Sequence, residues 1–149
     1  MVAAGYWVRH TAGTTYSIEP VDANHTVVSA ISGDYSVGGF LEVLMSPAES
    51  EGPLNYYQHD GTSWTSRTLI ASVEHGHSLQ PGDFDGDGNL DFFCAEMGDP
   101  GAGSDAHAWI GYGDGQGNFV LEVISVGLAN HESRVGDLDG DGDLDILMK

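Results

Sequence analysis

Two short acidic stretches are the residues of this sequence whose types and spacing could do chemistry. They run from Asp83 to Asp91 and from Asp137 to Asp145, and both follow the pattern Asp-x-Asp-Gly-Asp-Gly-x-x-Asp. Carboxylates at alternate positions can converge on one hard cation, because the glycines let the backbone turn through conformations with φ above zero. Each stretch is therefore predicted to bind one calcium ion, with position 7 supplying its backbone carbonyl.

The predicted ligands all lie within these two stretches. They are Asp83, Asp85, Asp87, Asn89 and Asp91 in the first, and Asp137, Asp139, Asp141, Asp143 and Asp145 in the second. The alternative is an acidic turn that is only solvated by water. Two copies with the same spacing of Asp and Gly favour the metal interpretation, which gives two calcium ions per chain.

The EF-hand is another calcium motif that begins in this way. It requires a bidentate Glu at position 12 and a helix on either side of the loop. Position 12 is Cys94 in the first stretch and Met148 in the second. The residues that follow, 90–95 and 144–148, are short apolar runs typical of buried strands. Each loop is therefore expected to join two β-strands.

A loop of this kind between a strand and a following apolar strand resembles the calcium loop of the FG-GAP and VCBS-type repeat families. The resemblance implies an all-β fold, in which blades of four antiparallel strands build a β-propeller. It is close over the two loops and extends along the chain through a weaker repeat. It also implies a likeness to the propellers of some polysaccharide lyases and sugar dehydratases, but it identifies a scaffold rather than a substrate.

The weaker repeat has a period of slightly more than fifty residues. Its markers are spaced 52 to 57 residues apart. They are three histidines, two Asp-Gly pairs and three aromatic residues: His25, His77 and His131; Asp60-Gly61 and Asp114-Gly115; and Trp7, Trp64 and Phe119. Internal repeats of this length are typical of propellers and other repeat architectures.

This period divides the chain into an outer strand at 6–11, a first repeat at 25–70, a second at 77–125 and a partial third at 131–148. The outer strand is taken as equivalent to 63–70 and 118–125, and a loop is expected after it. The remaining strands are predicted at 26–31, 40–45, 54–59, 77–84, 90–95, 106–112, 131–138 and 144–148. Asp-Gly turns close hairpins within the repeats.

The first repeat lacks the acidic pattern. In place of the acidic loop it has residues 32–39, where only Asp34 and the following Glu42 could coordinate a metal. No metal site is assigned to this repeat, and its glycines are expected to let the chain reach the same shape unaided.

The expected strands make about two and a half to three blades, whereas a β-propeller closes with roughly four to eight. A lone chain would therefore expose unpaired strand edges, which favour aggregation. We expect the ring to be completed either by further copies of this chain, as a homo-oligomer, or by the rest of a longer parent protein.

The repeated histidines are the second group that could do chemistry. His25, His77 and His131 would open three inner strands and so form a ring at one mouth of the central channel. They could be turn residues that bond a neighbouring blade, or a ligand site, and neutral imidazoles could also bind a transition metal. The catalytic candidates are His77, His131 and Arg134, because an imidazole could remove a proton beside a carboxylate.

The histidines and the acidic loops should not act together. Roughly 20 Å of strand separates each histidine from its loop, at about 3.3 Å per residue. Calcium is therefore expected to stabilise the fold rather than to take part in histidine chemistry.

Other side chains have simpler predicted roles. His59, His75 and His107 should lie on the surface, and Trp7, Trp64 and Phe119 should pack between blades. Tyr56, Tyr57, Trp109 and Tyr112 lie on third strands, where an exposed ring could stack on a sugar.

Composition limits the classes of partner. The 23 acidic and 4 basic residues give a net charge of −19, which would repel nucleic acid and anionic membranes, and nine of the acids lie in the two loops. The single cysteine, Cys94, is predicted to be a buried, inert thiol. The sequence has no stretch of about twenty apolar residues, so no membrane span is predicted. Residues 1–5 lack the charged and apolar regions of a signal peptide.

These observations favour a calcium-stabilised β-propeller module that binds a ligand, with carbohydrate as the favoured class. Extracellular calcium would fill loops of weak or moderate affinity, which favours an extracellular or periplasmic protein whose leader lies outside this sequence. One alternative is an enzyme similar to a polysaccharide lyase or sugar dehydratase that uses the histidine ring. Another is a purely structural or self-assembling adhesive repeat. Whether the protein is an enzyme stays open, and a non-catalytic role is favoured.

Overall fold

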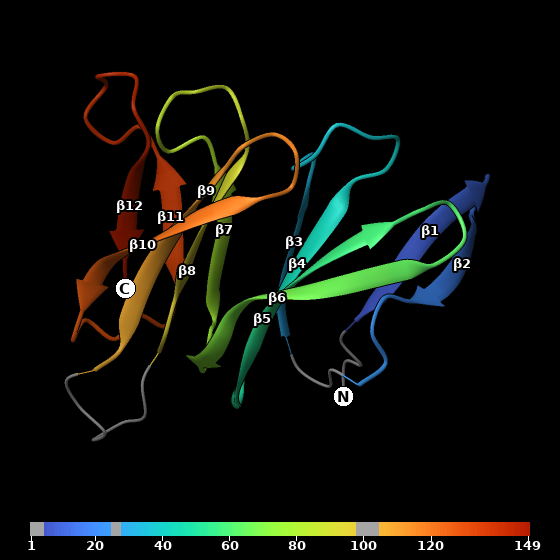
Figure 1. The fold of residues 1–149 in the computed structure, drawn as a ribbon, viewed down its shortest axis with the longest axis horizontal. Coiled ribbons are helices and arrows are strands. Elements are labelled where there is room, and N and C mark those ends of the chain that lie inside the picture. Colours follow the sequence, from blue (N-terminus) through green and yellow to red (C-terminus); the bar gives the residue numbers. More distant parts are fainter. Residues whose placement is uncertain (1–4, 25–27, 98–104) are drawn as a thin grey trace.

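The computed structural model describes residues 5–24, 28–97 and 105–149, and every regular element in them is a β-strand (Figure 1). The strands are β1 (Tyr6–Ala12), β2 (Thr15–Pro20), β3 (Val28–Gly33), β4 (Glu42–Pro47), β5 (Glu51–His59), β6 (Trp64–Glu74), β7 (Ser78–Gly82), β8 (Asp91–Ala95), β9 (His107–Gly113), β10 (Phe119–Val126), β11 (Ser133–Gly136) and β12 (Asp145–Met148). The predicted all-β fold is confirmed. No described segment forms a helix able to span a bilayer.

The strands form four antiparallel sheets that follow one another along the chain. Blade 1 has the order β3-β4-β5-β6, and blade 2 consists of β7 to β10 in sequence order. Two pairs flank these blades: the N-terminal hairpin, β1-β2, and the C-terminal hairpin, β11-β12 (Figure 1). The predicted four-stranded blades are confirmed, and the described residues do not close a ring.

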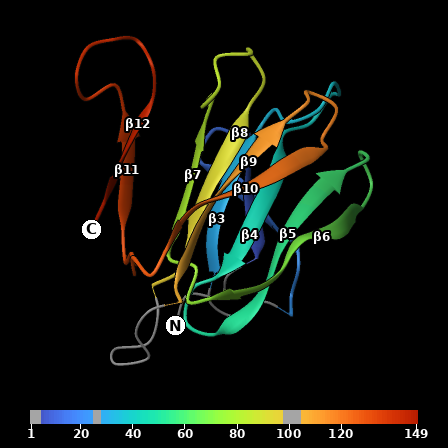
Figure 2. The same ribbon diagram turned by 60° about the vertical axis from the view of Figure 1, so that its left-hand side comes forward.

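The first strands of successive sheets lie beside one another. Strand β7 contacts β3 on one side and β11 on the other. The hydroxyl of Ser29 on β3 donates to the backbone carbonyl of His77 at 2.8 Å, which ties the two blades together. Figure 2 shows the C-terminal hairpin at one end of the row, with β11 next to β7. This arrangement is that of propeller blades whose inner strands surround a common axis.

Strand β8 is buried along its whole length because sheets cover both of its faces. Alternate residues of a strand point to opposite faces of the sheet. Phe92 and Cys94 accordingly belong to an apolar cluster shared with blade 1, whereas Phe93 and Ala95 belong to one shared with the C-terminal hairpin. The continuous apolar sequence of this strand follows from its place between two neighbours.

Aromatic rings fill the space between blades 1 and 2. The ring of Phe119 meets those of Tyr35, Tyr56 and Phe92 edge-on, at centroid distances of 5.6, 5.7 and 5.2 Å. Trp7 of the N-terminal hairpin likewise meets Trp64 at 5.9 Å. Such edge-to-face contacts add to the stabilisation from burial. The prediction that the repeated aromatic residues pack between blades is confirmed.

One strand was not predicted. Thr15–Pro20 forms β2, where the sequence was interpreted as a loop, and it pairs antiparallel with β1. Tyr16 and Ile18 alternate with polar residues, and this alternation is the sequence signal that could have predicted the strand. Both side chains are exposed, so the alternation does not mark a core-facing strand.

This strand changes the place of β1. In chain order β2 directly precedes the first strand of blade 1, as β6 directly precedes the first strand of blade 2. Strand β1 therefore takes the third-strand place, and its expected equivalence with the outer strands was wrong. The packing agrees, because Trp7 meets the first residue of β6 as Tyr56 meets Phe119, the first residue of β10.

Truncation of Phe92 should test the packing between blades. We expect Phe92→Ala to lower the free energy of unfolding by about 3–5 kcal/mol, because it removes a fully buried ring and leaves a cavity. Urea denaturation followed by circular dichroism measures this loss. Val37→Ala is the control, since its side chain is 93% exposed and the change should stay within about 0.5 kcal/mol. Equal losses in the two variants would contradict the packing described.

Candidate metal loops and histidine pair

The two acidic loops join the first strand of a sheet to the second, β7 to β8 and β11 to β12, at the same end of the molecule (Figure 1). The prediction that each loop joins two strands is confirmed. Gly86 and Gly88 have φ values of +74° and +88°, and Gly140 and Gly142 have +84° and +100°. These values lie in the left-handed region that favours glycine, which explains the spacing of glycines in the motif.

The first aspartate of each loop holds the backbone turn. Its side chain in the first loop, Asp83, accepts hydrogen bonds from the backbone N–H groups of Gly86 at 2.8 Å and Gly88 at 3.0 Å. The corresponding bonds to Asp137 measure 2.7 and 3.1 Å. The same local sequence therefore produces the same loop twice.

The last aspartate ties the first loop to the sheet. Asp91 is fully buried, and its two oxygens accept from the N–H groups of Phe84 and Gly113, each at 2.7 Å. A Cβ atom at Gly113 would lie 2.3 Å from the carbonyl oxygen of Leu90. The end of β9 can therefore approach the loop this closely only with glycine at position 113. The equivalent Asp145 accepts from the N–H of Leu138 at 2.9 Å.

Three carboxylates converge in each loop. Oxygens of Asp83, Asp85 and Asp91 lie within 4.8 Å of one another, and we call this group the first acidic triad. Oxygens of Asp137, Asp139 and Asp145 meet the same condition and form the second acidic triad. The structure thus brings together three of the five predicted ligands in each loop.

The other predicted ligands lie outside the triads. Asp87 accepts from both the backbone and the side-chain nitrogen of Asn89, each at 2.7 Å. Asp141 accepts from the backbone N–H of Asp143 at 3.0 Å. These residues shape the turn, and their coordination of a metal stays a prediction.

The first triad is a site where negative charge is costly. Burial raises the pKa of Asp91, and the charges of Asp85 and Asp83 raise it further, against the opposing effect of the two backbone N–H bonds. A cation between the three carboxylates would relieve this repulsion. Three converging carboxylates are hard oxygen donors, which is the chemistry that calcium prefers.

The first repeat closes its loop in another way. Glu42 pairs with Gly33 as Asp91 pairs with Gly82, so Glu42 takes the place of the last aspartate. Its carboxylate accepts from the backbone N–H of Tyr35 at 2.8 Å and from the hydroxyl of Ser36 at 2.6 Å. The longer side chain of Glu42 thus finds its hydrogen-bond partners within the loop.

The two described histidines of the predicted ring come together. His77 directly precedes β7 and His131 lies just before β11, at the ends of these strands away from the acidic loops. Their imidazole rings stack with a centroid distance of 4.8 Å and an interplanar angle of 19°. His25 lies outside the described residues.

The strand register places a different residue beside this pair. In the three sheets a glycine, Gly33, Gly82 or Gly136, pairs with the last residue of the loop. Five residues earlier the sequence has Val28, His77 and His131. Counted in this way, the equivalent position in blade 1 belongs to Val28 rather than to His25.

His77 occupies a mostly buried position. Its Nε2 atom has no hydrogen-bond partner among the described residues and lies 3.6 Å from a carboxylate oxygen of Glu49. Burial lowers the pKa of His77, Glu49 opposes this effect, and His131 and His75 lower it further. The lowered pKa favours the uncharged form of His77 at neutral pH, with an acid close by.

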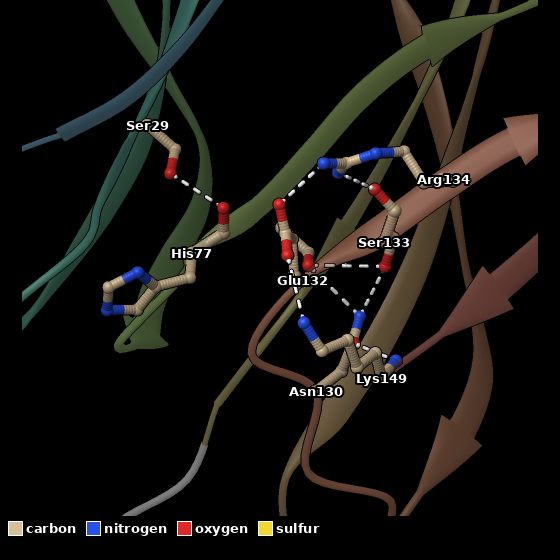
Figure 3. Close-up of polar contacts among 8 residues, drawn as sticks. Ser29, His77, Asn130, Glu132, Ser133, Arg134 and Lys149 are labelled. Atoms are coloured by element: carbon tan, nitrogen blue, oxygen red, sulfur yellow. Dashed lines mark hydrogen bonds and ion pairs between the residues drawn. The ribbon is translucent and has the colours of Figure 1, made fainter.

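Arg134 contacts a carboxylate rather than the histidines. Its guanidinium lies 2.6 Å from Glu132, which Lys149 also approaches at 3.4 Å (Figure 3). The hydrogen bond and charge of Arg134, followed by those of Lys149, lower the pKa of Glu132. The His77 ring points away from this group in Figure 3. Arg134 is therefore engaged in a surface ion pair, and its catalytic role stays a prediction.

A buried polar contact between sheets was missed in the sequence. The side-chain amide of Asn130 donates to the hydroxyls of Ser78 and Ser133, and its oxygen accepts from the N–H of Lys149 at 2.9 Å. Asn130 is fully buried, so these bonds join the C-terminal hairpin to blade 2 (Figure 3). The position has Gly76 as its counterpart in the preceding repeat, so the period gives no signal for it.

Three other histidines, which were predicted to lie on the surface, are only partly exposed. His59, His75 and His107 are all half-buried. The ring of His59 lies 4.9 Å from that of Trp64, and the ring of His107 stacks on Trp109 at 5.3 Å. Neighbouring rings cover part of His59 and His107, and this was not visible from the period.

Two other side-chain predictions have clear outcomes. Tyr56, Tyr57 and Trp109 are buried, which leaves Tyr112 as the half-buried ring among the proposed sugar-stacking residues. Cys94 is fully buried, and burial raises the pKa of its thiol to about 12. The prediction of a buried thiol is confirmed, and the raised pKa disfavours the thiolate, which is the reactive form.

A family comparison agrees with the repeat seen in the structure. The model of the FG-GAP-like repeat matches residues 34–94 and again 83–148. The chain belongs to the FG-GAP-like repeat family. Both matches begin at the first residue of a loop, Asp34 or Asp83, so the family unit extends from one loop into the next. Comparisons with curated proteins and with solved structures found no match.

The environment of His77 gives a prediction about its titration. Nuclear magnetic resonance should give His77 a pKa below its ordinary value of 6.5, and Glu49→Gln should lower it further by removing the opposing charge. Because the unfolded chain would bind this proton more readily, the stability linked to neutral His77 is present above about pH 6.5 and is lost on acidification. A His77 pKa above 6.5, or a higher pKa in the Glu49→Gln variant, would contradict the described burial of His77 and the effect of Glu49 on it.

Proposed function

We propose that this protein is a calcium-stabilised segment of a β-propeller, with one ion in each acidic loop. The observation that carries the proposal is the convergence of three carboxylates, which occurs twice with the same register. Asp83, Asp85 and Asp91 would hold the first ion, and Asp137, Asp139 and Asp145 the second. A bound ion supplies positive charge that offsets the repulsion among these side chains.

The contacts of Asp91 explain how binding at the loop would stabilise a blade. This residue belongs to the first acidic triad and also bonds the backbone of Gly113 at the end of β9. An ion held by the triad would therefore fix the first, second and third strands of blade 2 relative to one another. Since an unfolded chain does not preserve this geometry, the ion would bind mainly to the folded state.

Calcium should raise the stability of the protein. At a free concentration about one hundred times the dissociation constant, each site should add about 2.7 kcal/mol to the free energy of unfolding. Thermal denaturation in calcium and in a chelator measures the difference, and titration calorimetry should count two ions per chain. Identical melting curves under the two conditions would refute the proposal.

Variants of matched positions sharpen this experiment. Asp85→Ala and Asp139→Ala each remove one member of a triad, so each should abolish one of the two sites, and the double variant should not respond to calcium. Asp34→Asn is the control, because Asp34 takes the place of Asp83 in the loop that Glu42 closes. It should respond to calcium as the wild type does. A lost response in the control would indicate that general charge, rather than the triads, is responsible.

The histidine pair supports ligand binding as the second part of the proposed function. The stacked rings of His77 and His131 lie where two inner strands begin; Nε2 of His77 is buried there, whereas the exposed His131 presents a ring nitrogen. Such a nitrogen can accept a hydrogen bond from a hydroxyl, which is the group that carbohydrates offer in number. Carbohydrate is therefore the ligand class we propose. The protein would be exported, as proteins with FG-GAP repeats typically are extracellular.

Glycan-array binding tests this second part. The wild type should bind a defined class of glycan, and the variant His77→Gln with His131→Gln should lose at least tenfold in affinity while its calcium response stays intact. A variant that binds as well as the wild type would remove the histidines from the site. Acidic polysaccharides should also be assayed for turnover, since cleavage that the double variant abolishes would favour the lyase-like alternative over a binding module.

A further inference from the structure

A cavity lies between the N-terminal hairpin and blade 1. It has a volume of about 380 Å³ and is lined mainly by apolar side chains. Val43 and Met45 of β4 form part of its wall, with Ala30 of β3 beside them and Trp7 and Trp64 towards the hairpin. The cavity therefore borders the inner half of blade 1, next to a hairpin that occupies only the outer half of the neighbouring sheet.

The internal repeat shows what covers the same surface elsewhere in the chain. Counted from the last residue of each loop, Val43 and Met45 are equivalent to Phe92 and Cys94, and to Ile146 and Met148. Phe92 and Cys94 pack in the cluster shared with blade 1, and Ile146 and Met148 pack against blade 2. In both cases the second strand of the preceding sheet contributes to the cover together with the third, and at Val43 and Met45 the cavity lies where no second strand is present among the described residues.

The opposite face of the same strand shows the complementary feature. Leu44 and Phe93 are fully buried because the next sheet covers them. The equivalent residue of the C-terminal hairpin is Leu147, and it is 57% exposed. A leucine that should be covered by a following sheet and a cavity that should be filled by a preceding sheet are thus present in one molecule.

The two hairpins supply the two halves of one blade. The C-terminal hairpin follows blade 2 and provides the first and second strands of a sheet, β11 and β12. The N-terminal hairpin provides the third and fourth, because β2 directly precedes blade 1 and β1 packs as a third strand. Joined in the order β11-β12-β1-β2, they would form a sheet with the same number of strands as blades 1 and 2.

We propose that a second copy of this chain supplies the missing half-blade. The C-terminal hairpin of one copy pairs through β12 with β1 of the other, and its Leu147 enters the cavity beside Val43 and Met45. Each copy then contributes three blades, and two copies close a ring of six, which is within the four to eight blades of known propellers. The same contact forms twice about a two-fold axis, so no strand edge is left at the junctions.

Charge is compatible with this docking. The chain has only four basic residues, and two of them, Arg134 and Lys149, lie on the C-terminal hairpin. Both lie on its exposed side together with Leu147, in a shallow depression that also includes Glu132. Two of the four basic side chains of a strongly acidic chain therefore lie beside Leu147 on the side of the hairpin that would face the second copy.

Light scattering during size-exclusion chromatography in calcium tests the proposal. The wild type should have twice the chain mass of 15.7 kDa. Leu147→Asp should reduce this to one chain without loss of the β-sheet signal in circular dichroism, because the side chain is exposed within its own copy. Val37→Asp, which places the same charge on a 93% exposed residue of blade 1, should leave the mass unchanged. A wild type that stays monomeric at high micromolar concentration overturns the proposal, as does a mass other than two chains.

Cross-linking identifies the contact itself. Leu147→Cys and Val43→Cys are prepared as separate proteins, mixed and oxidised. A disulfide-linked dimer that contains one chain of each variant is expected, since the side chains meet only across copies, while Cys94 is buried and does not react. A linked product that forms as readily in either variant alone, or no linked product in the mixture, overturns the proposed pairing.

Discussion

The constraint on which the structure depends is that the second strand of blade 1, of blade 2 and of the C-terminal hairpin is apolar on both faces. Such a strand is stable only between two neighbouring sheets, because an apolar face left in water forfeits the stabilisation gained by burial. Phe92 and Phe93 on adjacent positions of β8 show the solution, since one belongs to a cluster with the preceding sheet and the other to a cluster with the following hairpin. Each such strand therefore requires a sheet on either side of it. The sheets at the two ends of the row have only one neighbour among the described residues.

The acidic loops occupy the turn that leads into this apolar strand. Each loop begins with an aspartate that holds the backbone turn and ends with one that bonds the backbone next to it, as Asp83 and Asp91 show. The loop thus sets where the apolar strand begins and which of its residues face each neighbour. In blade 1 Glu42 occupies the place of the last aspartate and bonds Tyr35 and Ser36 within the loop.

The opposite ends of the inner strands have a different character. There the stacked pair of His77 and His131 and the buried amide of Asn130 join successive sheets through polar groups. Buried polar groups must find partners to avoid a desolvation cost, so this end of the molecule depends on specific contacts rather than on apolar area. A ligand that reached His77 would act on the contact between two blades, far from the acidic loops.

The sequence by itself determined the features that are local in the chain. The spacing of Asp and Gly specified both loops, the apolar runs specified the strands that follow, and the period of slightly more than fifty residues gave the four-stranded sheets. These predictions were possible because the geometry of a loop and the faces of a strand depend on residues close together in sequence. The strand at Thr15–Pro20 was missed although Tyr16 and Ile18 alternate with polar residues there.

Only the tertiary structure decided the relations between sheets. It grouped three carboxylates of each loop, paired His77 with His131, placed Val28 rather than His25 at the equivalent position, and buried Tyr56 and Trp109. Each of these depends on the register between strands and on the packing of one sheet against the next. A pattern along one chain does not contain such information, because a shift of a single residue sends every side chain of a strand to the other face.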